Sequence, residues 1–296
     1  MRLVWHNWTG AIAGLLTACI VVGAAHLAAA DDALRTAAKK ILEQHKDAVV
    51  WVSAVARINF TTDDAKGLSL SLPEREQKYE ARGTVIGTDG LTVTALSLLD
   101  PSSQISGRTY STAAGQIKID AAVTLKEVKI IMPDGTELPA DVVMKDSDLD
   151  LAFIRPKPDA KELKGVVFKP VELTNNTTAD VADDVVTVSR TDEALNRQPA
   201  VERGHVVALT RKPRVFMYAT GTEYGCPTFA PDGKLLGITV NRFAKDKPPQ
   251  PVILPASDVH EIAAQAKAAK APDSGGASGR AAPDRAAGAP APSSSN

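Results

Sequence analysis

The sequence predicts an all-β fold, a barrel or a sandwich, with a short helix near each end. Many short runs of β-branched and apolar residues occur, and D-G turns separate several of them. Strand-like runs follow one another directly and do not alternate with helical patterns, which argues against a parallel α/β fold. The 296 residues, 44% of them hydrophobic, suffice for one large or two small domains with their own cores.

The first elements are predicted to be a helix, a strand and a loop. Apolar residues recur at helical spacing over residues 31–45, and residues 49–58 (V-V-W-V-S-A-V-A-R-I) are rich in β-branched residues. Residues 60–80 are polar and show no clear period, which predicts an insertion loop.

Two hairpins and a buried strand are predicted next. Residues 83–99 form a strand, the turn Asp89-Gly90 and a second strand. Residues 100–120, rich in Ser, Thr and Gly, predict a second long loop. A further hairpin spans 127–144 around P-D-G, and a short apolar strand follows at 149–155.

The second half of the folded part continues the same pattern. Strands are predicted at the following places: 185–189, 205–210, 214–218, 234–241 and 251–254. Ser257 or Asp258 can cap a last helix that continues to about Lys270. The remaining residues, 271–296, are mostly Ala, Pro, Gly and Ser, a composition that predicts disorder because it buries too little apolar surface.

Residues 1–30 have the pattern of a secretory signal peptide. Arg2 precedes an apolar run over residues 10–25, and small residues end at Ala30, the expected cleavage position. We therefore expect an exported protein, periplasmic or extracellular. Two alternatives stay open: a lipoprotein lipidated at Cys19 within L-T-A-C, and an uncleaved membrane anchor.

Charge and composition narrow the range of partners. The formal net charge is −1, so the chain has no basic field that would attract nucleic acid, and we expect membrane contact only through Cys19 or an uncleaved signal. No His/Cys cluster has zinc spacing, and the acidic turn around Asp150 lacks the Gly and distal Glu of a calcium loop. We expect no metal and no cofactor.

Three segments in order resemble trypsin-like serine proteases of the bacterial HtrA (Deg) type. They are G-T-V-I-G-T-D-G-L-T-V-T-A-L-S-L-L-D (83–100), the D-G hairpin leading to D-S-D-L-D-L-A-F-I (128–154), and Y-G-C-P-T-F-A-P-D-G-K-L-L-G-I (224–238). The resemblance covers about residues 45–262. It implies a domain over 31–270 with two six-stranded β-barrels, about 45–160 and 161–262, and an active cleft between them. After it we expect no PDZ domain, only the last helix and the tail.

The same resemblance places the catalytic triad on three residues, of which one is retained. The family's His falls on Ser97, its Asp on Asp150 and its nucleophilic Ser on Tyr224; Gly225 and Cys226 take the places of the Gly-Gly that follow the nucleophile. A hydroxyl cannot act as a base near neutral pH, and a phenol without a base stays protonated. The triad is therefore predicted to be degenerate.

Other residues offer weaker candidates for chemistry. Cys226 is either a reactive thiol or a small core residue, and its place before Pro227 and an apolar strand favours the core. His45, His205 and His260 fall on no position that the family uses for catalysis.

Three hypotheses for function follow. The first is an inactive protease-like module that binds a peptide or protein in the cleft between the barrels. The second is an active endopeptidase with a non-standard catalytic set that uses a serine-like or cysteine-dependent mechanism. The third is a structural envelope protein. The oligomeric state does not follow from the sequence.

Overall fold

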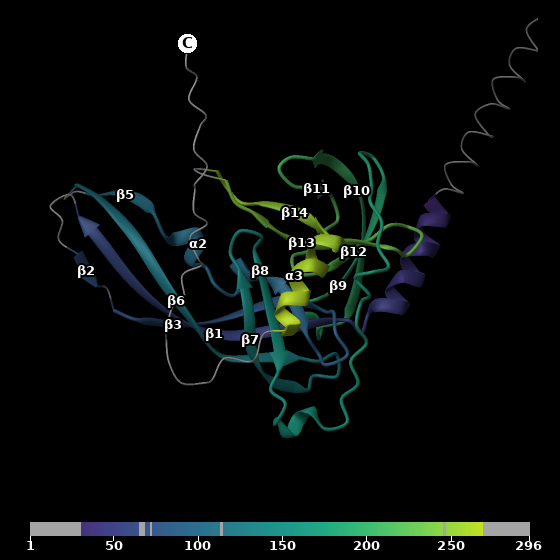
Figure 1. The fold of residues 1–296 in the computed structure, drawn as a ribbon, viewed down its shortest axis with the longest axis horizontal. Coiled ribbons are helices and arrows are strands. Elements are labelled where there is room, and N and C mark those ends of the chain that lie inside the picture. Colours follow the sequence, from purple (N-terminus) through teal and green to yellow (C-terminus); the bar gives the residue numbers. More distant parts are fainter. Residues whose placement is uncertain (1–30, 65–68, 72, 113–114, 245–246, 269–296) are drawn as a thin grey trace, which may run out of the picture.

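The computed structural model describes residues 31–64, 69–71, 73–112, 115–244 and 247–268. It consists of two closed antiparallel β-barrels side by side, with an arm of sheet that projects from the first (Figure 1). The all-β prediction and the two six-stranded barrels implied by the resemblance are confirmed. The predicted signal peptide and the predicted disordered tail lie outside the described residues.

The first barrel has the strand order β1-β3-β4-β8-β7-β6 and closes where β6 pairs with β1. Its strands are β1 (Val49–Asp64), β3 (Arg75–Val85), β4 (Thr92–Ala95), β6 (Gly115–Ile131), β7 (Glu137–Asp146) and β8 (Leu151–Pro156). Alternate residues of β1 point inward, and Val50, Val52 and Ala54 are fully buried in its core.

The second barrel closes in the order β10-β11-β14-β13-β12-β9. Its strands are β9 (Asp184–Arg190), β10 (Pro199–Thr210), β11 (Phe216–Ala219), β12 (Pro227–Phe229), β13 (Leu235–Arg242) and β14 (Gln250–Pro255). Each strand predicted from the sequence overlaps an observed strand, and most observed strands extend further than the predicted ones.

Helices lie at both ends of the fold, as predicted. The first covers residues 31–45, and the last, α3 (Ala256–Ala268), buries Val259, Ala263 and Ala266 in the core shared with β13 and β14. The connections hold four short turns of helix: η1 (Leu96–Leu98), α2 (Ser102–Ile105), η2 (Lys161–Leu163) and η3 (Glu193–Leu195). Among the described residues, no helix is both long and apolar enough to span a bilayer.

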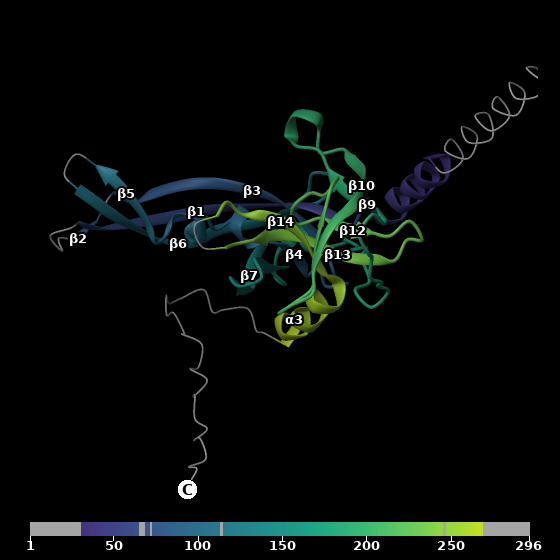
Figure 2. The same cartoon turned by 90° about the horizontal axis from the view of Figure 1, so that it is seen from above.

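The two predicted loops, 60–80 and 100–120, are wrong. β1 continues to Asp64 and pairs with β2 (Ser69–Ser71) and with the start of β3, while α2, β5 (Arg108–Thr112) and the first half of β6 occupy the second segment. These outer parts form the arm, which comprises residues 56–64, 69–71, 75–79, 108–112 and 115–126. The arm extends well beyond the barrel (Figures 1 and 2).

The arm has a weak strand pattern because one of its faces carries polar and small residues. In β6 the half-buried Ile117, Ile119 and Val123 alternate with exposed residues, a period of two that surrounding polar and small residues obscure. Opposite charges on neighbouring strands support the polar face. Arg57 of β1 lies directly opposite Glu76 of β3, and their side chains form an ion pair at 2.8 Å.

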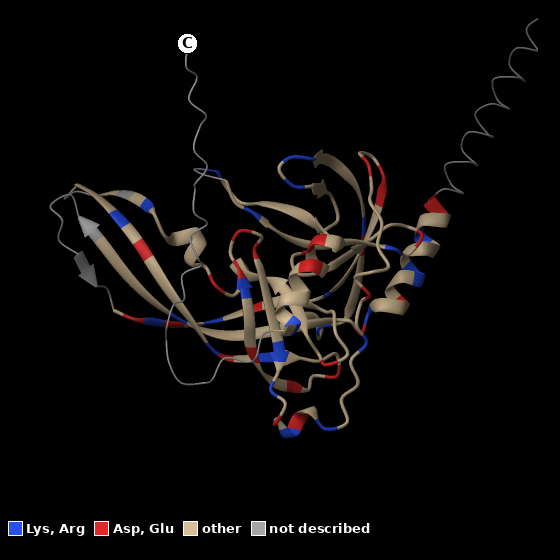
Figure 3. Ribbon diagram, in the orientation of Figure 1, with Lys and Arg blue, Asp and Glu red and all other residues tan. Residues whose placement is uncertain are grey.

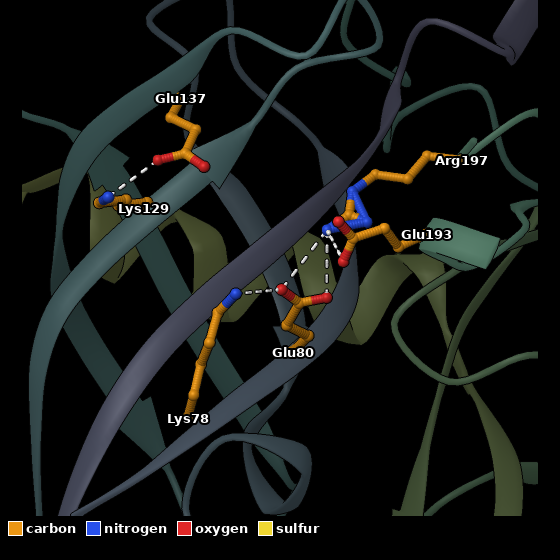
Figure 4. A network of polar contacts seen from close by, with 6 residues as sticks. All are labelled: Lys78, Glu80, Lys129, Glu137, Glu193 and Arg197. Carbon is orange, nitrogen blue, oxygen red and sulfur yellow. Dashed lines mark hydrogen bonds and ion pairs between the residues drawn. The ribbon is translucent and has the colours of Figure 1, made fainter.

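Arginines hold the two barrels together. Arg190, only 3% exposed, donates from its guanidinium to the carbonyl oxygens of Lys46, Val49 and Arg197 at 2.6, 2.5 and 2.9 Å. Arg197, in the β9–β10 connection, reaches across to Glu80 of β3 at 3.2 Å (Figure 4). Elsewhere charges of both signs are interspersed over both barrels (Figure 3).

We predict that Arg190→Met destabilises the protein by at least about 2–3 kcal/mol, because one buried and two partly buried carbonyl groups lose a charged donor. Urea unfolding followed by circular dichroism measures the change. The matched control is Arg211→Met, which removes an exposed ion pair with Asp180 and should cost less than about 1 kcal/mol. Equal effects of the two changes would contradict a role of Arg190 in joining the barrels.

Candidate functional site

Three residues from distant parts of the chain meet in a buried hydrogen-bond network. Ser97 lies in η1 just after β4, Asp150 directly precedes β8, and Asn241 lies near the end of β13. Asp150 Oδ1 accepts from the backbone N–H of Ser97 at 2.7 Å, and Oδ2 accepts from Ser97 Oγ at 3.0 Å. Oδ2 also accepts from the backbone N–H of Asn241 at 2.7 Å, which links the first barrel to the second.

Asp150 occupies an unfavourable position that its hydrogen bonds make tolerable. It is 2% exposed and has a φ of 57°, in the left-handed region. Burial raises the pKa of its carboxyl to about 6, against the opposing effect of hydrogen bonds from Asn241 and Ser97. At neutral pH the group is therefore ionised but carries a desolvation cost.

Asn241 is a site residue that the sequence did not indicate. Its Nδ2 donates to Ser97 Oγ at 2.9 Å, so this hydroxyl both accepts from Asn241 and donates to Asp150. The one available signal was an Asn at the end of the apolar run L-L-G-I-T-V-N. The hydroxyl of Ser97 thus both donates and accepts a hydrogen bond, and no histidine of the described residues is among its partners.

The three histidines within the described residues lie elsewhere. His45 stacks on Phe229 with ring centroids 4.5 Å apart, and burial lowers its pKa. His205 is exposed on β10, with its ring near the hydroxyl of Thr220, and His260 is exposed on α3. None of them forms a hydrogen bond with Ser97, Asp150 or Tyr224.

Tyr224 is half-buried near this network and makes no hydrogen bond to Ser97 or Asp150. Burial raises the pKa of its phenol, and the negative charges of Asp150 and Glu223 raise it further. The phenol is therefore protonated at neutral pH. Without a base in contact, it has no means of becoming a nucleophile.

The turn after Tyr224 is fixed by packing against the first barrel. Gly225 has a φ of 72°, and a Cβ added to it would collide with the carbonyl oxygen of Arg82, so only glycine fits. Its N–H donates to the Thr239 carbonyl at 2.8 Å, and its own carbonyl accepts from Thr84 Oγ1 at 2.7 Å.

Cys226 is a core residue in this structure. It is fully buried, and burial raises the pKa of its thiol far above the usual range. Its N–H donates to the Glu223 carbonyl at 3.2 Å. The N–H groups of both Gly225 and Cys226 are therefore engaged in hydrogen bonds within the protein.

Glu223 ties the turn to the first barrel through charge. Arg82 Nη1 lies 3.0 Å from Glu223 Oε2, and the same guanidinium sits 4.9 Å above the ring of Trp51. Burial and the neighbouring Glu223 carboxylate raise the pKa of Glu202. No local sequence pattern indicates this cluster, because its members come from three different strands and a loop.

Across the part of the chain that the structure describes, no group of three or more His, Cys, Asp or Glu side chains is arranged to hold a metal ion.

Comparison with known proteins assigns the family. The trypsin-like peptidase domain family matches residues 81–238, more than half of the chain. The chain belongs to this family. No curated protein matches the chain. Among solved structures it is similar to the MamO protease domain from Magnetospirillum magneticum in its apo form, at 16% identity and a TM-score of 0.44, with 74% of this chain and 97% of that chain covered.

We predict that the stability contributed by Asp150 decreases as the pH rises. Its pKa is raised from 3.8 to about 6 on folding, so between these values the folded protein retains a proton that the unfolded chain has lost. From about pH 4 to pH 7, the unfolding free energy of the wild type should fall by up to about 3 kcal/mol relative to that of Asp150→Asn. Urea titrations of both proteins at several pH values measure this. A difference that stays constant or grows with pH would contradict it.

We also predict that the Cys226 thiol is inert in the folded protein. Iodoacetamide at pH 8 should label it at least about a hundredfold more slowly than in urea, because the thiolate is inaccessible and disfavoured. Mass spectrometry of the peptide that contains Cys226 measures the rate. Rapid labelling of the native protein would instead support a reactive cysteine.

Proposed function

We propose that this chain is an exported, catalytically inactive member of the trypsin-like family, of HtrA type, that binds a peptide or protein segment at the cleft between its barrels. The observation that carries the proposal is the hydrogen bonding of the Ser97 hydroxyl. At the position where the family keeps its base, this hydroxyl is held between Asp150 and Asn241.

The neighbouring groups support the same conclusion. Tyr224, at the position of the nucleophile, is a protonated phenol, and no histidine of the described residues forms a hydrogen bond with it. Acyl transfer in this family needs a base and a nucleophile that act together. Family membership with an intact double barrel and an incomplete catalytic set is best explained by binding without turnover.

Export is part of the proposal and rests on the sequence. Residues 1–30 carry the signal-peptide pattern, with cleavage expected after Ala30. The lipoprotein alternative at Cys19 predicts a lipidated N-terminal cysteine. Mass spectrometry of the native N-terminus distinguishes the two.

We predict that the wild-type protein neither cleaves unfolded casein nor reacts with a fluorophosphonate probe. If both occurred, and both were lost on changing Tyr224 or Cys226, the chain would be an active peptidase with a non-standard catalytic set, and the proposal would be wrong.

The double change Ser97→His with Tyr224→Ser should restore probe labelling, whereas neither single change should. A histidine at position 97 can donate to Asp150 from the place where Ser97 Oγ now does. Adding Asp150→Asn to the double variant should slow labelling by about 10³-fold or more. Labelling of a single variant would show that the triad positions were assigned wrongly.

A further inference from the structure

A large hollow lies beside the degenerate site, between the base of the arm and the chain that leaves β13. Its volume is about 940 Å³, and its lining includes Gln104, Arg108, Thr109, Phe243, Lys247 and Pro249. Both walls connect to the site. Gln104 Nε2 donates to the carbonyl oxygen of Ser97 at 3.1 Å, and Phe243 follows Asn241 by two residues.

One wall of the hollow is an open sheet edge. β5 is the last strand in its sheet and pairs only with β6. Thr112 and Gly115 are opposite each other across a two-residue connection, so residues 108, 110 and 112 direct their backbone groups toward β6. The N–H and C=O of Thr109 consequently face away from β6, and Thr109 is one of the residues that line the hollow. This edge can accept another strand.

The described residues of the lining carry charge of one sign. Among them the ionised side chains are Arg108 and Lys247, both cations, and none is a carboxylate. Both side chains are exposed, and neither forms an ion pair within the described part of the protein. The connection from which Lys247 comes has the sequence K-D-K, in which residues 245 and 246 lie outside the described residues. Two cations that have no ion pair among the described residues, placed beside an open sheet edge, favour an acidic ligand.

We propose that the hollow binds an acidic segment of a partner protein in extended conformation, which adds as a strand to β5. Backbone hydrogen bonds to Thr109 would supply affinity, and carboxylates on the segment would pair with Arg108 and Lys247. The inference rests on the proposed function, since it specifies the ligand class and the place of binding beside the inter-barrel site. The two proposals depend on different residues: binding to β5 depends on the arm, and loss of catalysis depends on the triad positions.

The test is fluorescence anisotropy with a labelled short peptide of alternating Glu and Thr, which favours extended conformation, and a Lys/Thr peptide of equal length. The full protein should bind the Glu/Thr peptide at least about tenfold more tightly, and less tightly as NaCl is added. Arg108→Glu with Lys247→Glu should weaken binding by about tenfold or more. The control Lys39→Glu with Lys40→Glu makes the same change in net charge on the N-terminal helix, at the opposite end of the molecule from the arm (Figure 1). This control variant should bind the Glu/Thr peptide as tightly as the wild type does.

Backbone pairing is tested separately at Thr109. Thr109→Pro removes the outward N–H of an edge strand that tolerates proline, and should weaken binding by about fivefold or more, whereas Thr109→Val retains the N–H and should bind like the wild type. Circular dichroism and urea unfolding establish that each variant is folded. Equal loss in both Thr109 variants would overturn the strand pairing.

The remaining outcomes are equally decisive. No binding by the folded wild type, or equal binding by wild type and the Arg108/Lys247 variant, overturns the inference and leaves the proposed function standing. Self-association in sedimentation that is lost in that variant would make a second copy the occupant and overturn a foreign partner. Cleavage of casein by the wild type overturns the proposed function, whether or not the Glu/Thr peptide binds to the protein.

Discussion

The buried carboxylate of Asp150 is the constraint on which the arrangement of the site depends. An ionised group that is 2% exposed carries a desolvation cost of several kcal/mol unless donors surround it. Here the donors come from both barrels: Ser97 from the first and Asn241 from the second. The carboxylate therefore fixes how the end of β4 and the end of β13 sit relative to each other. This role gives Asp150 a structural reason to be present without any imidazole to orient.

The same interface shows why the backbone of this site does not depend on which residues occupy positions 97 and 224. The turn at Gly225 is held by backbone contacts to Arg82 and Thr239 and by the hydroxyl of Thr84, none of which requires a nucleophile. Arg190 adds three hydrogen bonds to carbonyl oxygens of segments on either side. Packing and hydrogen bonding thus specify the backbone of the site, while residues 97 and 224 are free to differ.

What the sequence predicts well is the part of the fold in which each strand carries its own pattern. The barrel strands have buried residues at every second position or on both faces, so their apolar runs are visible locally. The sequence did not predict the arm because one of its faces carries polar and small residues, and because its strands pair with partners far away in the sequence, as Arg57 does with Glu76. Such pairs join residues far apart in sequence and leave no local signature. Asn241 and the Arg82–Glu223 pair were missed for the same reason. The triad positions could be placed only because three motifs occur in the order that the family has.

The site around Asp150, where the two barrels meet, and the arm that projects from the first barrel complement each other. Closure removes the sheet edges of a barrel, so a strand partner has nowhere to add on a closed barrel. In the described sheets the unpaired edges belong to the arm, and one of them, β5, borders the hollow next to Ser97. A protease must let its ligand leave after each turnover, which limits how much backbone pairing it can use. A protein whose catalytic groups are absent has no such limit, because tight binding of the ground state is then the function and no transition state competes for it. Under the proposed function, an open sheet edge beside a site without turnover is the arrangement that this physical difference favours.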